Sequence, residues 1–562
     1  TLARIFLFAL LLFCGHGFAQ ERDESPNVLF IAVDDLNDWV GCLAGHPQAK
    51  TPNIDRLAAK GVLFEQAYCA APLCHPSRTA ILTGLCPSTT GVYGNRNWFR
   101  NLPRLKDWTT LPQHFRKNGY LAVSGGKIFH KSDGEWSDPQ SWDEQYSTAM
   151  GTPPPPESER YRHGMRGEFS NKILDRLIDW APLETPKEET QDLKTAQGAA
   201  SFLKRSHDKP FFLACGIYRP HLSWYAPKEF FDLHPLDKIE LPPYLETDLE
   251  DVPARGRVMA GKEFEIIRDH DQWKQAVQGY LASTSFADSC VGVVLDALNE
   301  SRYRNNTIVV LWGDHGYHLG QKNHVAKSAL WQPATRTPLI IHVPGQSESQ
   351  PNRDSEERVA ALRCKRPVSL IDLYPTLIEL CGLPPRDDLD GRSVAPLVRD
   401  PTMAWPYPAI ITHSPHWHGV NHAIRSQRYH YIRYGDGGEE LYDMTKDPNQ
   451  WKNLADSLAH TDVIKEHRKW LPAKNAVHHT ESATRVHRLK STFRSPFDAF
   501  LYVNRIPASP ESDETQDDLA GRILGRLANQ EGRVLIKLPP GMNRDAYHGF
   551  KIALGSESRR DS

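Results

Sequence analysis

Three short, uninterrupted apolar runs stand out along the chain, at residues 27–33, 211–216 and 307–312. Each is rich in β-branched or aromatic residues and bounded by polar ones. Runs of this kind are typical of strands buried on both faces of a parallel sheet. Helical periodicity is found instead at 275–298 and 370–380. The pattern predicts an α/β fold with a large mixed sheet and helices on both faces.

Two middle segments lack a clear period. Residues 151–195 contain four consecutive prolines and many charged side chains, and residues 238–268 are similar in character. Proline clusters interrupt regular structure. We therefore expect exposed insertions or long loops here, of the kind that often forms the rim of a substrate pocket.

The pattern of apolar residues changes after about residue 400, where short aromatic segments replace the long apolar runs. Residues 423–426 and 429–434 predict a hairpin or meander, with the glycine-rich stretch 435–438 as the turn. A smaller C-terminal antiparallel sheet is therefore expected. The predicted division of the chain is a signal peptide over 1–19, a catalytic domain over 26–400, a C-terminal subdomain over 401–485 and an extension of unassigned role over 486–562.

The first residues have the features of a targeting segment. Arg4 precedes the apolar run 5–14, which is too short to span a bilayer, and small residues follow up to Ala19. We expect a secretory signal peptide and export to the periplasm or the extracellular medium. Lipoprotein anchoring at Cys14 fits less well, because Phe13 is too large for the position before such a cysteine. No other apolar stretch suggests a transmembrane span.

Composition limits the classes of binding partner that the protein can have. The 562 residues include 67 basic and 69 acidic side chains, so no overall field favours nucleic acid or an anionic membrane. Any selectivity for anions must come from a local site. If Cys14 and Cys74 are set aside, seven of the nine cysteines remain, an odd number without metal-type spacing. This excludes a disulfide framework, although one or two bridges are compatible with export.

The segment Cys-His-Pro-Ser-Arg-Thr-Ala-Ile-Leu-Thr-Gly at 74–84 combines small residues with an amphipathic pattern. It predicts a helix, with Ser77 and Thr79 as local caps and Gly84 as its end. Cys74 then lies at the helix N-terminus, where backbone N–H groups and the helix dipole favour an anion. Both a reactive thiol and a buried structural cysteine fit this position.

Acidic residues follow two of the predicted strands. Asp34 and Asp35 end the first apolar run, and Asp314 and His315 follow the third. Ligands of open α/β sheets bind at the carboxyl ends of strands, and adjacent carboxylates repel each other unless a cation neutralises them. Three carboxylates suit a hard cation with oxygen ligands, calcium more than zinc. The alternative is a solvated Asp-Asp turn.

Further candidates lie between and after these strands. Lys127 and His130 follow a glycine turn, His221 comes just after the second predicted strand, and Lys327 follows the third. By itself Lys127 is equally an ordinary surface lysine. A cluster of histidines with one tryptophan precedes the C-terminal strands, and metal binding, a packed loop and a sugar subsite are its alternatives, of which we predict the last. The cluster comprises His413, His416, Trp417, His418 and His422.

The 74–84 segment resembles the signature Cys-x-Pro-Ser-Arg-x-x-x-Leu-Thr-Gly of the type I sulfatases at every fixed position. The resemblance extends from about residue 27 to about residue 472. Many sulfatases have Asn where this chain has His315, and the histidine is similar to the iduronate 2-sulfatase-like branch. The resemblance implies an alkaline-phosphatase-like sulfatase fold.

The resemblance also implies roles for the candidate residues. A formylglycine-generating or sulfatase-maturing enzyme would oxidise Cys74 to formylglycine, whose aldehyde hydrate attacks sulfur and leaves a covalent sulfate. His130 would deprotonate or orient the hydrate, and His221 would protonate the leaving oxygen. The implied calcium ligands are Asp34, Asp35, Asp314 and His315 with the modified Cys74, and the implied sulfate contacts are Arg78, Lys127 and Lys327.

The expected activity is hydrolysis of sulfate esters on a sulfated sugar or polysaccharide. Three alternatives stay open on the sequence. A phosphoester or phosphonate hydrolase on the same fold would use nearly the same metal and cations. A sulfated-glycan-binding protein without catalysis would leave Cys74 unoxidised. Cys74 could also serve in a structural disulfide.

Overall fold

The computed structural model describes residues 25–96, 98–147, 150–151, 155, 163–345, 362–415 and 419–477. The predicted signal peptide and the predicted extension over 486–562 lie outside the described residues. So do Cys14 and three members of the histidine cluster, His416, Trp417 and His418.

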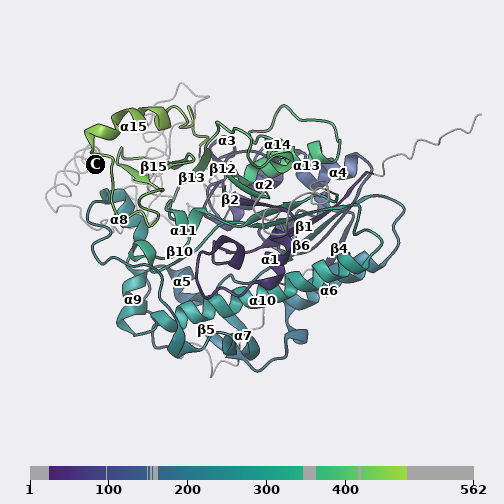
Figure 1. Cartoon of the computed structure of the whole chain (residues 1–562), viewed down its shortest axis with the longest axis horizontal. Helices are drawn as coiled ribbons and strands as arrows, with labels where there is room; N and C mark the ends of the chain where they lie inside the picture. The colour runs from purple at the N-terminus through teal and green to yellow at the C-terminus, as the bar shows by residue number, and fades with distance from the viewer. Residues whose placement is uncertain are drawn as a thin grey trace, which may run out of the picture.

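An eight-stranded mixed sheet forms the centre of the protein (Figure 1), in the order β12-β2-β11-β8-β1-β6-β3-β4. The strands are β1 (Asn27–Val33), β2 (Val62–Tyr68), β3 (Leu121–Gly126), β4 (Glu144–Ser147), β6 (Phe211–Ile217), β8 (Thr307–Gly313), β11 (Leu339–His342) and β12 (Arg363–Ser369). Of these, β11 runs antiparallel to both neighbours, while the other neighbouring pairs are parallel. The predicted α/β fold with a large mixed sheet is confirmed.

The three predicted apolar runs form adjacent strands, β8, β1 and β6, and every residue in them is buried. Their pairing aligns the carboxyl ends, because Val33 of β1 is opposite both Gly313 of β8 and Ile217 of β6. The segments that leave these strands therefore start at one edge of the sheet. This register brings together residues that are far apart in the sequence.

Helices cover both faces of the sheet (Figure 1). One face packs against α1 (Pro52–Ala58), α6 (Gln191–Lys204) and α10 (Trp273–Glu300), and the other against α2 (Cys74–Thr83), α4 (Leu111–Lys117), α13 (Leu373–Leu380) and α14 (Ala395–Arg399). Alternate side chains of β1 serve the two cores: Leu29 faces the first and Phe30 the second. Both predicted helices are confirmed, and the second opens with the 3-10 turn Leu370–Asp372.

The two middle segments predicted as loops contain regular structure, so that prediction was wrong for part of their length. They include α5 (Lys172–Leu177), β5 (Trp180–Leu183), α8 (Ala254–Ala260) and α9 (Glu263–Asp269), and β5 pairs with β7 (Trp224–Pro227). In α9, Phe264 and Ile267 are three residues apart and share one buried face. Such short amphipathic turns are difficult to predict, because their few apolar residues are surrounded by charged ones in the sequence.

A four-stranded antiparallel sheet follows, as predicted. It consists of β13 (Ala409–His413), β14 (Asn421–Arg425), β15 (Tyr429–Arg433) and β16 (Glu439–Asp443), with α15 (Thr461–Arg468) after it. The glycine-rich turn 435–438 joins β15 to β16. This sheet packs against the main domain, because Ile411 and Ile432 belong to the same hydrophobic core as Phe30.

Helix α10 is long and apolar enough to cross a membrane by length and composition, which the sequence analysis did not anticipate. However, 78% of its most apolar window is buried inside the protein, as in a core helix.

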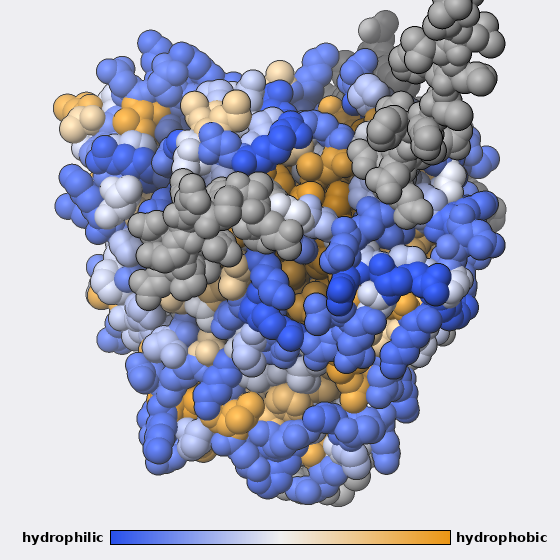
Figure 2. Space-filling model, turned by 45° about the vertical axis from the view of Figure 1, so that its right-hand side comes forward, coloured by the Kyte–Doolittle hydropathy of each residue, from blue (hydrophilic) through white to orange (hydrophobic). Residues whose placement is uncertain are grey.

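The face shown in Figure 2 is covered mainly by hydrophilic residues, with hydrophobic residues in smaller groups between them. All eight cysteines within the described residues are free thiols, so the structure has no disulfide there, including at Cys74.

Candidate active site

Helix α2 begins at Cys74 and ends at Thr83, and Gly84 caps it in the left-handed conformation (φ 71°), as the sequence predicts. The predicted caps are wrong: the residue before the helix is Leu73, which has no side-chain cap. Ser77 instead points inward, and its hydroxyl donates to the Asp314 carbonyl oxygen at 2.6 Å. The helix that starts with Cys74 is thus attached directly to the end of β8.

The three carboxylates predicted to bind a metal converge at the edge of the sheet. Asp34, Asp35 and Asp314 are fully buried, and the Asp35 backbone N–H donates to Asp314 Oδ1 at 2.9 Å. Asp35 has a positive φ of 56°, an uncommon conformation for a residue other than glycine. Its carbonyl oxygen accepts a hydrogen bond from the Tyr280 hydroxyl of α10 at 2.8 Å. This contact ties the turn after β1 to the core helix.

Arg78, one helical turn after Cys74, connects two of the carboxylates. Its Nε donates to Asp314 Oδ2 at 2.8 Å and its Nη2 to Asp34 Oδ1 at 3.0 Å. Its Nη1 donates to the carbonyl oxygens of Lys127 and Ile128, at 2.5 and 2.9 Å. Since Arg78 is fully buried, these charge-assisted bonds compensate a guanidinium without contact to water.

Two lysines pair with the remaining carboxylate oxygens. The Lys127 ammonium donates to Asp34 Oδ2. The Lys327 ammonium lies 2.7 and 2.9 Å from the two carboxylate oxygens of Asp35, and 3.1 Å from Cys74 Sγ. Neither lysine is an ordinary surface residue, because their side chains are 3% and 16% exposed.

These charges determine how the first two carboxylates ionise. Burial raises the pKa of Asp34, but Lys127 above all outweighs it and holds the pKa well below its usual range. Burial also raises the pKa of Asp35, but His221 and Lys327 outweigh this effect and lower the pKa to about 2. Both groups are therefore carboxylates at neutral pH.

The third carboxylate and the thiol respond differently. Burial raises the pKa of Asp314 to about 6, although Arg78 opposes it. Burial would also raise the pKa of the Cys74 thiol, but Lys127 and Lys327 outweigh it and hold the pKa well below its usual value. A sulfur atom near two ammonium groups at a helix N-terminus is in the electropositive environment that reactive cysteines require.

His315 completes the group around the sulfur. Its Nδ1 lies 3.0 Å from the Gly316 carbonyl oxygen and donates to it, so Nε2 faces the cluster. Nε2 lies 3.3 Å from Cys74 Sγ and 3.4 Å from Asp35 Oδ1. Burial lowers the pKa of His315, but Asp314 and its other acidic neighbours outweigh it and raise the pKa to about 9.

The two remaining histidines lie in different surroundings. His221 Nδ1 is 2.6 Å from the Leu222 carbonyl oxygen, so Nδ1 donates and Nε2 faces Asp35 Oδ2 at 3.9 Å. His130 packs against the rings of His75 and Trp136, and its buried Nδ1 has no hydrogen-bond partner among the described residues. Burial and the Lys127 ammonium lower the pKa of His130 strongly.

Potential metal-ligand atoms lie within 4.8 Å of one another in two overlapping groups. One contains Asp34, Asp35, Cys74 and His221, and the other contains Asp35, Cys74, Asp314 and His315. All residues predicted as metal ligands are thus brought together, and His221 joins them. His130 belongs to neither group.

Sequence reasoning missed the residues that hold His221 in place. Asp192 of α6 is buried and accepts hydrogen bonds from the backbone N–H groups of Tyr218 and Arg219, at 2.7 and 3.2 Å. Arg219 in turn donates to the His221 carbonyl oxygen at 2.9 Å. The available signal was a capping pattern, because Thr190 caps α6 and Asp192 lies in its first turn.

The described members of the histidine cluster belong to strands of the C-terminal sheet. Across β13 and β14, His413 is opposite Asn421 and His422 is opposite Thr412, whose hydroxyl is 3.1 Å from His422 Nδ1. Burial lowers the pKa of His422 to about 4. Neither histidine belongs to a metal-ligand group within the described residues. The sugar subsite stays a prediction.

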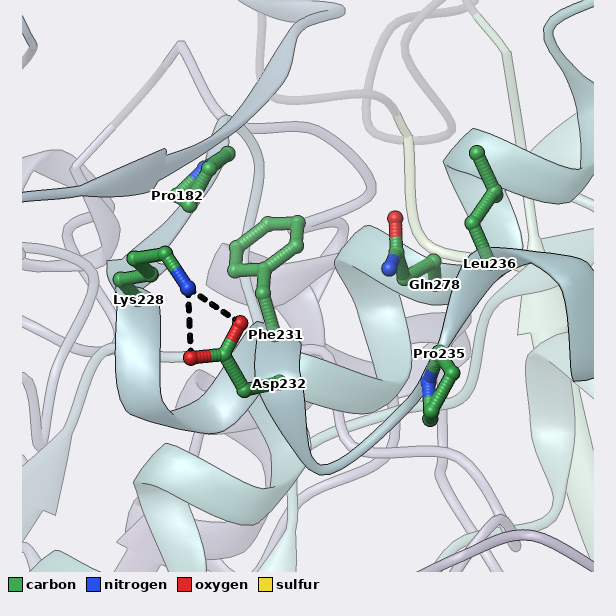
Figure 3. A pocket seen from close by; sticks show the side chains of 7 residues that line it. All are labelled: Pro182, Lys228, Phe231, Asp232, Pro235, Leu236 and Gln278. Carbon is green, nitrogen blue, oxygen red and sulfur yellow. Dashed lines mark hydrogen bonds and ion pairs between the residues drawn. The ribbon is translucent and has the colours of Figure 1, made fainter.

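A surface hollow beside α7 (Lys228–Asp232) is a separate feature (Figure 3). Its wall carries an ion pair, with the Lys228 ammonium 2.5 and 2.6 Å from the two carboxylate oxygens of Asp232, and apolar side chains such as Phe231 and Leu236. None of the predicted site residues lines it.

Comparisons with known proteins identify the family of the chain. The sulfatase family model matches residues 26–383, and the model for the C-terminal part of N-sulphoglucosamine sulphohydrolase matches residues 320–476. A sulfatase from Formosa agariphila is 38% identical over 475 residues, which cover 82% of this chain and 89% of that protein. Human iduronate 2-sulfatase is 33% identical over 404 residues, covering 66% of this chain and 71% of that protein.

The fold is shared more widely. A phosphonate monoester hydrolase from Silicibacter pomeroyi superimposes with a TM-score of 0.64 at 20% identity, covering 79% of this chain and 94% of the other. At that identity the likeness shows the fold alone. The family match and the two relatives also show the family and the activity. The chain belongs to the sulfatase family and is a sulfuric ester hydrolase.

Proposed function

We propose that this enzyme hydrolyses a sulfate ester on a sulfated sugar or polysaccharide, with formylglycine made from Cys74 and with a calcium ion. One observation carries the proposal: Cys74, three carboxylates and three cationic side chains meet at the common edge of β8, β1 and β6. The name of the human relative, iduronate 2-sulfatase, supports a sulfated sugar as the substrate class.

The charge balance of the site suits an anionic substrate. The three carboxylates are matched by three permanent cations, Arg78, Lys127 and Lys327. A divalent cation would add two positive charges beside largely buried side chains. A sulfate monoester carries one negative charge, so such a site would bind it favourably.

The donor set fits calcium. The carboxylates of Asp34, Asp35 and Asp314 supply oxygen ligands, which calcium prefers. His315 would add Nε2, which its bond to Gly316 directs toward the cluster. Bound there, calcium would supply positive charge to the sulfate oxygens.

Cys74 is suited to supply the nucleophile after modification. It is the first residue of α2, beside Lys327 and His315. Once hydrated, the aldehyde of formylglycine offers an oxygen nucleophile that a thiol does not. The proposal therefore includes a sulfatase-maturing enzyme as a partner of the nascent chain.

The cations take different parts in the proposed reaction. Four of the five Arg78 N–H groups are used by protein acceptors, so its main part is to orient Asp34 and Asp314. Lys127 and Lys327 each hold an ammonium that can turn toward sulfate oxygens, where they stabilise developing negative charge. Because these groups are fixed before the substrate arrives, their stabilisation needs little rearrangement.

The two histidines have separate roles. His221 Nε2 faces the cluster from the more open side, since its side chain is 12% exposed, and we assign it the proton delivered to the leaving alcohol. The lowered pKa keeps His130 a neutral imidazole, and its buried Nδ1 has no hydrogen-bond partner among the described residues. We assign it to orient the nucleophile through a hydrogen bond.

Two measurements test the proposal together. Peptide mass spectrometry across Cys74, after coexpression with a maturing enzyme, should find formylglycine. Sulfate release should then be detected from sulfated mono- or oligosaccharides, and turnover of the matched phosphate esters should be much slower. An unmodified Cys74 in a protein that still releases sulfate would overturn the assigned nucleophile, and faster phosphate release would overturn the substrate class.

We also propose that the protein is exported by way of residues 1–19. The basic residue followed by a short apolar run supports this. N-terminal sequencing of the protein recovered from the periplasm or medium tests it, with a new terminus near Ala19 as the expected result. Protein retained inside the cell with an uncut terminus would contradict the proposal.

A further inference from the structure

Lys327 is carried by a short loop with unusual backbone geometry. The loop comprises residues 320–328. It begins directly after β9 (His318–Leu319), contains the two-residue strand β10 (Val325–Ala326) and ends two residues after it. Five of its nine residues have positive φ, namely Gly320 (117°), Lys322 (58°), Asn323 (48°), Ala326 (117°) and Ser328 (72°). Four of these are not glycine. Such conformations persist only where surrounding contacts hold them.

The strongest of these contacts belongs to Lys322. Its ammonium donates to Asp248 Oδ1 at 2.7 Å, to the Tyr442 hydroxyl at 3.3 Å and to the Gln450 carbonyl oxygen. The Lys322 side chain is only 1% exposed. Tyr442 belongs to β16, so this lysine joins the Lys327 loop to the C-terminal sheet. A charge this deeply buried is costly without its partners.

The loop is held again on the side of the active site. The Ser328 N–H donates to the carbonyl oxygen of Pro72, two residues before Cys74, at 3.0 Å. His324 Nε2 lies 3.0 Å from the Lys327 carbonyl oxygen. The loop therefore spans from the C-terminal sheet to the start of α2, with Lys322 at one end and Lys327 near the other.

We propose that Lys322 is a positioning residue for Lys327, through which the C-terminal sheet fixes the ammonium beside Cys74 and Asp35. Lys322 touches none of the predicted site residues. It acts by keeping the loop in the one conformation that places the Lys327 ammonium 3.1 Å from Cys74 Sγ. The inference rests on the proposed role of Lys327 in sulfate binding.

The test is a double-mutant cycle on the matured enzyme with a nitrophenyl sulfate. The variants are Lys322→Met, Lys327→Ala and their combination, with the formylglycine content of each measured. Displacing a catalytic group by about 1 Å can cost 100-fold, so Lys322→Met should lower kcat/KM by roughly 10–100-fold. In the Lys327→Ala background the same change should cost roughly twofold or less, because the displaced group is already absent.

A matched control separates positioning from general destabilisation. Asp288 of α10 is equally buried, and its carboxylate accepts from the Ile54 N–H at 2.8 Å, away from the site. Asp288→Ala should lower Tm and leave kcat and KM unchanged, whereas Lys322→Met should change kcat and KM in the same directions as Lys327→Ala. A loss of Tm alone in Lys322→Met would overturn the proposal.

The remaining outcomes are also decisive. Losses from Lys322→Met and Lys327→Ala that multiply would mean that Lys322 acts independently, against the proposal. If Lys322→Met does not fold, Asp248→Asn takes its place in the same cycle, because it keeps the shape and removes the charge that Lys322 faces. Full activity in Lys327→Ala would instead overturn the role of Lys327, and so the proposed function at that point.

Discussion

The Lys327 ammonium lies 3.1 Å from the sulfur of Cys74, although the two residues are 253 positions apart in the chain. The same ammonium bridges to Asp35, which lies two residues after the end of β1. One lysine thus touches both the proposed nucleophile position and a proposed metal ligand. Together with the Lys127 ammonium, it holds the pKa of the buried Cys74 thiol low, and it determines which substitutions should be informative.

Replacing the nucleophile should remove activity and leave the fold intact. Cys74→Ala should lower kcat/KM by roughly 10⁴-fold or more, since no other side chain can be oxidised to the aldehyde there. Lys327 keeps both of its bonds to Asp35, so the free energy of unfolding should fall by only about 1 kcal/mol. Sulfate release and chemical denaturation measure the two effects. Activity retained in this variant would refute the role of Cys74.

Removing the metal should abolish activity reversibly. Chelation should inactivate the enzyme, and calcium should restore it better than zinc because most proposed ligands are carboxylate oxygens. Asp314→Asn should weaken metal binding roughly 10–100-fold or more. Asp372→Asn is the matched control, since that buried carboxylate accepts the Ser369 and Arg392 N–H groups outside the cluster. Active enzyme without a divalent ion by elemental analysis would contradict the site.

Buried carboxyl groups outside the site should make stability fall as pH rises. Burial raises the pKa of Asp248, Asp288 and Asp372 to about 6, above the value of 3.8 expected in the unfolded chain. Between about pH 4 and 6 the folded protein therefore holds protons that the unfolded chain has lost. Raising the pH through this window removes a stabilising contribution on the order of 3 kcal/mol at most for each group.

Asp288→Asn tests this dependence. The variant has no carboxyl group to ionise at that position, so its Tm should decline less steeply than that of the wild type between pH 4 and 7. The Tm of the variant should still decline with rising pH, because Asp248 and Asp372 still titrate. Parallel Tm curves for the two proteins would show that Asp288 does not have the raised pKa.

Much of the site could be predicted from the positions at which the strands end. Because β8, β1 and β6 read as continuous apolar runs, they were recognisable as buried parallel strands, and parallel strands end at one edge. Asp34, Asp35 and Asp314 could be placed together on that basis alone. The helix beginning at Cys74 could also be predicted, since Gly84 marks its end.

Other parts depend on contacts that no local pattern encodes. Ser77 reads as a helix cap in sequence, yet its hydroxyl is directed to Asp314 by the packing of α2 on the sheet. Lys322 reads as a surface lysine in a polar loop, and its burial depends on Asp248 and Gln450, which are 74 and 128 positions away. Such long-range partners become visible only once the C-terminal sheet is placed against the main domain.

The two histidines should be separable by leaving group. A general acid matters most when the leaving group is poor, because a sugar alkoxide needs a proton and an activated aryl oxide hardly does. His221 presents Nε2 toward Asp35 from the exposed side, where the leaving alcohol would depart. His221→Ala should therefore lower kcat/KM roughly 10²–10⁴-fold on a sugar sulfate and far less on a nitrophenyl sulfate.

His130 gives the contrasting result. The Lys127 ammonium acts on it, and its buried Nδ1 has no hydrogen-bond partner within the described part of the chain, which suits a role toward the nucleophile that both substrates share. His130→Ala should slow both substrates by similar factors. The measurement is the ratio of mutant to wild-type kcat/KM on each substrate. Equal losses on both substrates for His221→Ala would remove it from the acid role and leave it as a contact to the sulfate or the sugar.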